Sequence, residues 1–451
     1  MGDDAISRYV FVNRSRPVVP AKYMTSIPVT FESLGLAEPI QRAISAKNYT
    51  EPSPIQARAI PYLLDGRDLM GCAQTGTGKT AAFALPILHL LATNKKRAKP
   101  HRPRALILTP TRELAGQIAQ NFSEYGKHLP LRHTVIYGGV RQGPQVRALK
   151  SGADILVATP GRLLDLFQQK QIDLSELEIF VLDEADRMLD MGFVHDVKRI
   201  LAQLPAQRQS LLFSATMPES ITTLAQSFLN DPATVTIAPE APTADRIRQR
   251  ICHVDRTNKP KLLLHLLNEN EEGLALVFSR TKHGANRLAR RLSTDGIRAE
   301  AIHGNKSQAA RERALNQFRK GAVRVLVATD IAARGIDVKG VSLVVNFDLP
   351  NEPEAYVHRI GRTARAGTDG AAFSLCEPEE RTYLRNIQRL IRQEITIHDD
   401  HPYALEVTPT ALAEIRGNGR APAGQKGRSR GNRRRRFRGS RSNQRRSPSR
   451  G

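Results

Sequence analysis

One short polar segment has residue types that bind phosphate and a metal ion. Ala73-Gln-Thr-Gly-Thr-Gly-Lys-Thr80 follows an apolar stretch and precedes a helical pattern that begins near Lys79. This is P-loop spacing, with Ala73 in the usual first Gly place: the glycines turn backbone N–H groups toward phosphate, Lys79 reaches the β- and γ-phosphates, and the Thr80 hydroxyl suits Mg²⁺. A chance Gly-rich turn is the alternative, and the order of strand, loop and helix argues against it. The expected phosphate-site residues are Gln74, Thr75, Gly76, Thr77, Gly78, Lys79 and Thr80.

An acidic pair follows a second apolar stretch. Asp183-Glu-Ala-Asp186 comes directly after residues 179–182. Asp183 would hold Mg²⁺, and Glu184 could orient and deprotonate an attacking water. A solvated acidic strand end is the alternative. The P-loop, and a next strand that ends in Ser214-Ala-Thr216, favour the catalytic interpretation.

These motifs need elements that bring strand ends together. Apolar runs alternate with helical stretches between residues 65 and 240, and the alternation restarts after a Pro-containing stretch at 239–245 that reads as a linker. The runs are continuous rather than alternating, which is typical of parallel strands covered by helices on both faces. The pattern predicts an α/β fold with two doubly wound parallel-sheet domains in series and functional groups at the carboxyl ends of strands. The expected strands are 68–71, 105–109, 155–158, 179–182, 210–213, 274–278, 323–328, 342–346 and 371–375, and two expected helices are 282–293 and 308–320.

Length and charge narrow the class of protein. A chain of 451 residues favours two domains plus extensions, and a net charge of +24 favours a polyanion partner, either nucleic acid or an anionic membrane surface. Apolar runs long enough to span a bilayer are absent, and the first ten residues lack a signal-peptide core. Cys72, Cys252 and Cys376 are far apart and suggest neither a disulfide framework nor a metal site. A cytoplasmic location is expected.

Much of the positive charge lies at the end of the chain. Residues 416–451 contain 14 Lys or Arg and no Asp or Glu, which leaves +10 for residues 1–415. This Gly-, Ser- and Arg-rich segment cannot bury enough apolar surface to offset its ordering entropy, so we expect it to be disordered. A salt-sensitive phosphate-binding arm is the favoured interpretation, and a solubilising appendage is the alternative.

Taken together, the P-loop, Asp183-Glu-Ala-Asp186 and Ser214-Ala-Thr216 resemble motifs I, II and III of the DEAD-box RNA helicases. The resemblance covers roughly residues 28–395 and implies two RecA-like domains. Residues 110–115 resemble motif Ia, and residues 138–139 and 159–162 resemble further RNA-contacting loops of the family. Backbone N–H groups, hydroxyls and guanidinium groups on such loops suit a sugar–phosphate backbone without base reading. The RNA-binding residues implied here are Pro110, Thr111, Arg112, Gly139, Thr159 and Arg162, and the implied coupling residues are Ser214 and Thr216.

Residues 49–56 resemble the family's Q motif, with Phe31 at the preceding aromatic position. The Gln56 amide offers one donor and one acceptor, which match adenine N6 and N7, and Phe31 or Tyr49 could stack on the adenine ring. An isolated Gln and aromatic are more often surface or core residues, but their position before a P-loop favours binding. Asn48 stands where the family usually has Gly, and Asn tolerates left-handed backbone angles.

The second half carries the family's other motifs. Residues 277–281 resemble motif IV, 303–311 the Gln-x-x-Arg element, 328–337 motif V and 358–365 motif VI. The resemblance implies an ATP ribose contact by Asp337 and RNA contacts by Arg280, Thr281, Gln308, Arg311 and Thr329. It also implies coupling by His358.

Motif VI has a helical pattern, which predicts that Arg362 and Arg365 share one face. That spacing suits two arginine fingers on one γ-phosphate, and a solvated basic helix face is the alternative. Ala364 replaces the usual Gly of this motif, which leaves the turnover rate open.

The family resemblance implies RNA-stimulated ATP hydrolysis coupled to local duplex unwinding or RNA–protein remodelling, with ATP and Mg²⁺, RNA as a sequence-independent partner, no membrane, and a monomeric core. Residues 191–196 and the basic tail resemble the bacterial RhlE branch. Ribosome assembly, on ribosomal precursors, or RNA decay is expected by analogy. The expected divisions are an N-terminal extension (1–27), a first domain (28–238), a linker (239–246), a second domain (247–398), and an extension and tail (399–451).

Three other functions would use some of the same motifs. A non-catalytic RNA clamp predicts loss of Glu184 or of an arginine finger, and both are present. A DNA helicase or translocase of the same fold is less favoured, because the Asp-Glu-Ala-Asp form with a Q motif argues for RNA. A small-molecule kinase with a P-loop would not need the arginine pair of the second domain.

Overall fold

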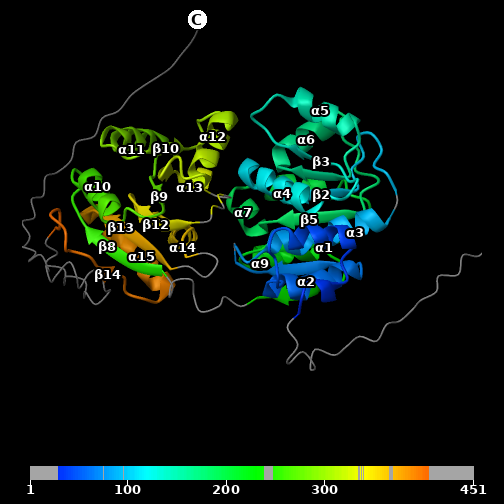
Figure 1. Cartoon of the computed structure of the whole chain (residues 1–451), viewed down its shortest axis with the longest axis horizontal. Helices are drawn as coiled ribbons and strands as arrows, with labels where there is room; N and C mark the ends of the chain where they lie inside the picture. Colours follow the sequence, from blue (N-terminus) through cyan, green and yellow to red (C-terminus); the bar gives the residue numbers. More distant parts are fainter. Residues whose placement is uncertain are drawn as a thin grey trace, which may run out of the picture. The chain divides into compact units, whose positions relative to one another are not determined.

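Two parallel sheets, each flanked by helices, follow one another along the chain in the computed structural model (Figure 1). The structure describes residues 29–405 except 75, 95, 238–246, 334–335, 337, 339 and 365–368. The expected linker, the N-terminal extension at 1–27 and the basic tail at 416–451 lie outside the described residues.

The first sheet has the strand order β3-β4-β2-β5-β6-β1-β7. Its strands are β1 (Leu69–Cys72), β2 (Ala105–Leu108), β3 (His133–Ile136), β4 (Ile155–Ala158), β5 (Ile179–Asp183), β6 (Gln209–Ser214) and β7 (Ala233–Thr236). The short helix η2 (Glu32–Leu34) precedes α1 (Glu38–Ser45), α2 (Pro54–Leu64), α3 (Lys79–Thr93), α4 (Arg112–Tyr125), α5 (Gln142–Lys150), α6 (Pro160–Gln168), α7 (Ala185–Asp190), α8 (Val194–Leu201) and α9 (Glu219–Gln226).

The second sheet has the strand order β10-β11-β9-β12-β13-β8-β14, which repeats the first order with every number raised by seven. Its strands are β8 (Ile247–His253), β9 (Leu274–Phe278), β10 (Ala299–Ile302), β11 (Val325–Ala328), β12 (Val341–Asn346), β13 (Gly370–Cys376) and β14 (Thr396–Ile397). The helices are α10 (Lys259–Glu269), α11 (Lys282–Thr294), α12 (Gln308–Arg319), α13 (Asp330–Ala333), α14 (Pro353–Ile360), η3 (Pro378–Glu380) and α15 (Arg381–Ile391). The restart of the apolar pattern therefore reflects a repeated topology.

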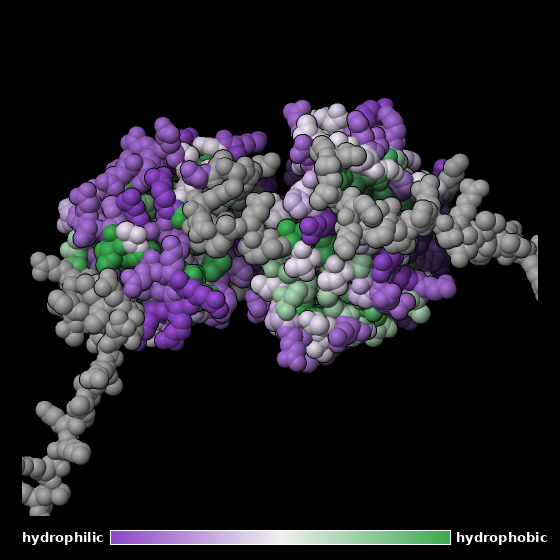
Figure 2. Space-filling view, turned by 90° about the horizontal axis from the view of Figure 1, so that it is seen from below, coloured by the Kyte–Doolittle hydropathy of each residue, from purple (hydrophilic) through white to green (hydrophobic). Residues whose placement is uncertain are grey.

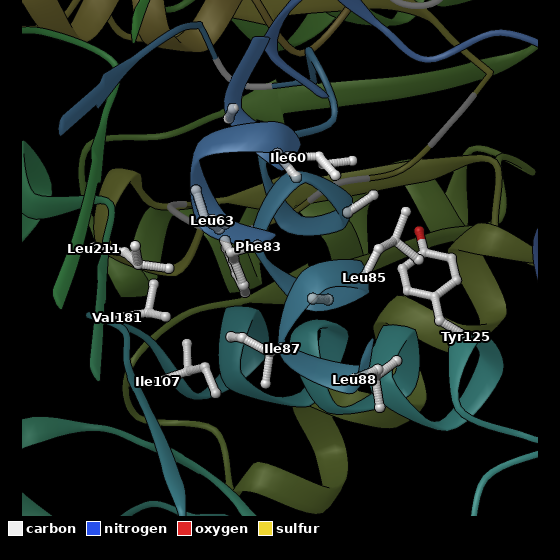
Figure 3. Close-up of a cluster of buried hydrophobic side chains, with 14 of the residues drawn as sticks. Ile60, Leu63, Phe83, Leu85, Ile87, Leu88, Ile107, Tyr125, Val181 and Leu211 are labelled. Carbon is white, nitrogen blue, oxygen red and sulfur yellow. The ribbon is translucent and has the colours of Figure 1, made fainter. Parts of the chain in front are cut away.

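The central strands are apolar throughout because both faces of the sheet are buried. Along β2, Ile107 faces one hydrophobic cluster and Leu106 the other, and Val181 and Leu182 divide in the same way on β5. Helix α3 supplies Phe83 to the first cluster (Figure 3). Its ring centroid lies 5.4 Å from that of Phe213 on β6. This packing anchors the helix that begins at Lys79 directly against the sheet.

The two sheets confirm the expected α/β class. Each expected strand is present, with its ends shifted by at most two residues, and the expected helices at 282–293 and 308–320 end one residue later and one residue earlier, respectively. The sequence pattern missed β3, β7, β8, β10 and β14.

Hydrophilic side chains cover much of the face seen in Figure 2. Every helix in the described part of the chain is too short or too polar to cross a bilayer.

Candidate nucleotide and RNA site

The strand order gathers the phosphate and acidic motifs at one place. β5, β6 and β1 are consecutive neighbours in the first sheet, with Asp183 in register with Phe213 and Cys72 with Ser214. The three strands are parallel, so the segments that follow their carboxyl ends emerge at the same edge. The P-loop, the Asp183–Asp186 turn and the Ser214–Thr216 segment therefore meet there, as a doubly wound sheet requires.

The P-loop is a tight turn that leads into α3. Gly76 and Gly78 have φ angles of +88° and +91°, a left-handed region that glycine adopts without strain. The buried Lys79 donates from Nζ to the carbonyl oxygen of Ala73 at 2.6 Å. Thr77 closes the turn by donating from Oγ1 to the carbonyl of Gln74 at 2.7 Å. The half-buried Thr80 follows in the first turn of α3, and Thr75 lies outside the described residues.

The acidic turn is buried and electrostatically crowded. Burial, followed by the neighbouring Glu184 carboxylate, raises the pKa of Asp183 to about 7, while Lys79 opposes the rise. The backbone N–H of Glu184 donates to Oδ1 of Asp183 at 3.0 Å, and Glu184 itself has a φ of +53°. A hard divalent cation would favour the ionised carboxylate here, so the donors present fit Mg²⁺.

A Mg²⁺ ion at this turn would not need a dedicated protein cage. Within the described residues no group of three or more His, Cys, Asp or Glu side chains is placed to hold a metal ion. Mg²⁺ usually keeps several waters and takes one or two protein oxygens together with substrate phosphates. Asp183 and the Thr80 hydroxyl match that pattern.

Asp186 joins the acidic turn to the segment after β6. Its Oδ2 accepts from the backbone N–H groups of Ala215 and Thr216 at 3.1 and 3.0 Å and from the Thr216 hydroxyl at 3.1 Å. Its own N–H donates to Oγ of Ser214 at 3.2 Å. Ser214 and Thr216, the expected coupling residues, are therefore bonded to the acidic turn itself.

Gln56 links the segment before α2 to the P-loop. Its Oε1 accepts from the N–H of Ser53 at 2.9 Å as part of a capping box, and its Nε2 donates to the carbonyl of Gly78 at 3.1 Å. Phe31 stacks on the half-buried Tyr49, with centroids 6.3 Å apart, but only 5% of Phe31 is exposed. Asn48 has a φ of +57°, so its backbone has the left-handed conformation that Asn tolerates.

Two arginines that we expect to bind RNA converge on one glycine loop. A Cβ atom on Gly139 would lie 2.1 Å from Nη1 of Arg112, so the guanidinium group rests against this loop. Arg162 donates to the carbonyl of Val140, the next residue of this loop, at 3.3 Å. The buried Thr111 and Thr159 precede α4 and α6, and Thr111, next to the buried Pro110, caps α4 through Leu114 N. Residues 110–112, 138–140 and 159–162 thus follow the adjacent strands β2, β3 and β4.

The corresponding edge of the second sheet carries the second set of expected RNA residues. Thr281 caps α11 by accepting from the N–H of Gly284, and the half-buried Thr329 follows β11. Arg280 donates to the carbonyl of Leu349 at 3.2 Å and pairs with the buried Glu380. The Arg280 guanidinium is therefore engaged within its own domain, and its RNA contact stays a prediction.

Glu113 brings Gln308 and Arg311 together. Nε2 of Gln308 lies 3.2 Å from Oε1 of Glu113, and Nη2 of Arg311 lies 3.0 Å from Oε2. Burial lowers the pKa of Arg311, although Glu113 opposes the fall. Both residues are therefore engaged with motif Ia in this structure.

The helical prediction for motif VI is wrong at its second half. Helix α14 ends at Ile360, and Arg362 lies in the turn beyond Gly361, donating to the carbonyls of Ile336 at 2.8 Å and His358 at 3.2 Å. Ala364 has a φ of +53°, which a helix excludes and which explains why Gly is usual there. Burial, then the charges of Arg187 and Arg362, lowers the pKa of His358. Arg365 and Asp337 lie outside the described residues.

The sequence assigned no role to three buried charged residues of these motifs, Glu113, Asp186 and Arg359, or to the buried Arg187 directly after the acidic motif. Arg359 makes a two-armed ion pair with Asp330, at 2.6 and 2.7 Å, and so fixes motif V against motif VI. The sequence did hold a signal for this pair: Asp330 lies two residues after a strand, and Arg359 is an arginine of motif VI without an assigned role. Pairing across that distance in sequence could not be read from the chain alone.

Comparison with known proteins agrees with this geometry. Residues 53–224 match the DEAD/DEAH box helicase family and residues 258–367 the helicase conserved C-terminal domain. DEAD-box ATP-dependent RNA helicase CshA of Bacillus cereus is 43% identical over 366 residues, covering 81% of this chain and 69% of that protein. ATP-dependent RNA helicase DeaD of Haemophilus influenzae is 46% identical over 368 residues, covering 81% and 59% respectively.

A solved structure has the same fold. S. cerevisiae Dbp5 bound to RNA and ADP BeF3 is 34% identical, with a TM-score of 0.72 and coverage of 82% of this chain and 95% of that one. The family matches, the identity to named relatives and the tandem parallel sheets agree with one another. The chain belongs to the DEAD-box ATP-dependent RNA helicases.

Proposed function

We propose that this helicase couples RNA-stimulated ATP hydrolysis to local unwinding of short RNA duplexes or remodelling of RNA–protein complexes, with the motif residues in the roles given below. The observation that carries the proposal is the meeting of three motifs at one sheet edge, where the Asp186 carboxylate joins two of them, the acidic turn and the 214–216 segment. The loss of the γ-phosphate on hydrolysis would therefore alter the position of the 214–216 segment through the Asp186 carboxylate.

On the nucleotide side, the chain's own groups divide the work. Lys79 neutralises the β- and γ-phosphates once its bond to the Ala73 carbonyl is exchanged for phosphate oxygens. Glu184 orients the attacking water and accepts its proton. Bound Mg²⁺, held by Thr80 and Asp183, would neutralise developing charge on the phosphates. Arg362 and Arg365 act as the arginine fingers, and Asp337 holds the ribose.

On the RNA side, loops at the edges of both sheets hold a single strand through its phosphates. Arg112 and Arg162 flank the Gly139 loop, and Thr281 and Thr329 follow strands of the second sheet. Contacts of this kind position a backbone without reading bases, so binding should be independent of sequence. Gln308 and Arg311 bind the Glu113 carboxylate in this structure. During the ATP cycle they would either release Glu113 to bind RNA or keep this contact and hold motif Ia in place.

The cellular context is proposed by analogy with the family. A cytoplasmic, monomeric core acting in ribosome assembly or RNA decay is our proposal. The assignment to the RhlE branch stays a prediction, since the relatives reported above are named CshA and DeaD.

ATP hydrolysis and strand displacement by the full chain test this function. We expect hydrolysis to rise on addition of single-stranded RNA and a short RNA duplex to separate only with ATP. Matched single-stranded DNA is the control. A rate of ATP hydrolysis that RNA does not raise, or that DNA raises equally, would contradict the proposal.

A further inference from the structure

Glu184 forms an ion pair with Arg187, a residue that has no role in the proposed function. Nη1 of Arg187, one turn further along α7, donates to Oε2 of Glu184 at 2.5 Å. Both side chains are less than a tenth exposed. Arg187 makes this ion pair with no other carboxylate among the described residues competing for it. The pair therefore occupies one of the two carboxylate oxygens of the proposed water-orienting residue.

Hydrogen bonds hold the backbone at Arg187 in place. The preceding residue, Asp186, is held by the Ser214–Thr216 segment through four hydrogen bonds. The backbone N–H of Arg187 in turn donates to Oδ1 of Asp186 at 3.0 Å. The origin of the Arg187 side chain is thus fixed relative to both the acidic turn and the end of β6.

A glutamate side chain by itself has several rotamers, and losing them costs free energy. Glu184 also begins from a left-handed backbone angle, φ +53°, which sends its side chain away from the ordinary helical direction. With Oε2 on the guanidinium group, the rotation of the carboxylate is set, and Oε1 is the oxygen left for water. Stability alone does not require an ion pair here, because buried ion pairs can often be replaced by apolar side chains without loss of stability. The pairing of Arg187 with Glu184 therefore favours a role in positioning the carboxylate.

We propose that Arg187 is a positioning residue for Glu184, selecting which carboxylate oxygen faces the attacking water. The inference rests on the proposed role of Glu184 in ATP hydrolysis. Arg187 itself contacts neither substrate nor metal. Its effect on turnover is transmitted through Glu184.

Steady-state ATPase of the full chain at saturating RNA provides the first test. Arg187→Met, which keeps the length of the side chain but removes the charge, should lower kcat by about 10- to 100-fold, the loss expected when a reacting group is misplaced by about 1 Å. The KM for ATP and the half-saturating RNA concentration should stay within about twofold, because neither ligand contacts Arg187. Arg187→Lys should restore part of kcat. Arg199→Met is the matched control, since the exposed Arg199 pairs with the half-buried Asp196 at the same i,i+3 spacing, 3.7 Å apart.

A double-mutant cycle separates positioning from general stabilisation. In the Glu184→Gln background, Arg187→Met should change the single-turnover hydrolysis rate by less than about twofold, because the group it positions is already gone. Full multiplication of the two losses would overturn the proposal, as would wild-type kcat in Arg187→Met. If Arg187→Met folds poorly, the same cycle with Arg187→Lys decides the question. Wild-type hydrolysis in Glu184→Gln would instead refute the proposed function, whatever the Arg187 variants do.

Discussion

Nε2 of Gln56 donates to the carbonyl oxygen of Gly78 at 3.1 Å, and so joins the Q motif to the turn that precedes Lys79. Because Oε1 of the same amide accepts from Ser53, both ends of Gln56 have protein partners. Replacing Gly78 by a larger residue would place its Cβ 2.3 Å from this nitrogen. The proposed recognition of the base and the shape of the P-loop therefore involve the same side chain.

Gln56→Ala should weaken the binding of ATP more than the binding of GTP. The expected penalty for ATP is about 1–3 kcal/mol, the value of one good bidentate base contact. Gln56→Glu is the matched variant, because its carboxylate can still accept from Ser53 N but cannot donate to Gly78 or to adenine. Nucleotide competition binding measures both. Equal losses for ATP and GTP would mean that Gln56 acts only through the P-loop.

Gly139→Ala should impair RNA binding by displacing Arg112. The new methyl group would meet Nη1 at 2.1 Å and would also sit on a φ of +77°. We expect the RNA concentration for half-maximal ATPase to rise roughly fivefold, equivalent to the loss of about 1 kcal/mol of charge-assisted contact. Gly143→Ala, whose Cβ would make an ordinary 3.7 Å contact in α5, is the control. Identical RNA titrations for both variants would remove Arg112 from the RNA site.

Deleting residues 416–451 should weaken RNA stimulation at low salt. The segment carries 14 positive charges and no negative ones, so it should act as a tether that raises the RNA concentration near the two domains. The half-saturating RNA should rise while the maximal ATPase rate stays close to that of the full chain. The difference should shrink as salt rises, because screening weakens the intact protein toward the truncated one. Equal half-saturating RNA at low salt would favour a solubility or docking role for the tail.

The second domain should become sensitive to acid through His253. Burial, then the charge of Arg381, lowers the pKa of His253 from 6.5 to about 4. The unfolded chain therefore takes up this proton as the pH falls below about 6.5, whereas the folded chain resists it down to about 4, so stability is lost over that window and regained as the pH rises. His253→Gln should reduce the fall in the urea unfolding midpoint between pH 7 and pH 5. The exposed His283→Gln is the control, and an unchanged fall in His253→Gln would exclude this origin.

The parts of the fold that the sequence predicted are those buried on both sides. Strands such as Ile155–Ala158 and Leu274–Phe278 are apolar at nearly every position because helices cover both faces. The missed strands have mixed surroundings. Thr234 and Thr236 of β7 are exposed while Ala233 and Val235 are buried, and β8 carries Arg248 and Arg250. Such strands lack the continuous apolar signal.

The candidate site shows the same division. The P-loop and the acidic turn could be predicted because each is a local segment whose chemistry depends on spacing along the chain. The pairs Glu113–Arg311 and Asp330–Arg359 join residues far apart in sequence, and nothing local marks them. The helical prediction for the second half of motif VI is wrong because periodicity does not register that the helix ends before Gly361 and that Ala364 is left-handed.

The ATPase rate of Glu184→Gln, at saturating ATP and RNA, tests the central claim most directly. The substitution keeps the size of the side chain and removes the proton-accepting carboxylate, so nucleotide and RNA binding should be kept while turnover falls by about 10²-fold or more. RNA retained on the protein with ATP would show that the loss lies in hydrolysis and not in binding. A turnover rate close to wild type would contradict the assignment of Glu184, and with it the account of how this helicase uses ATP.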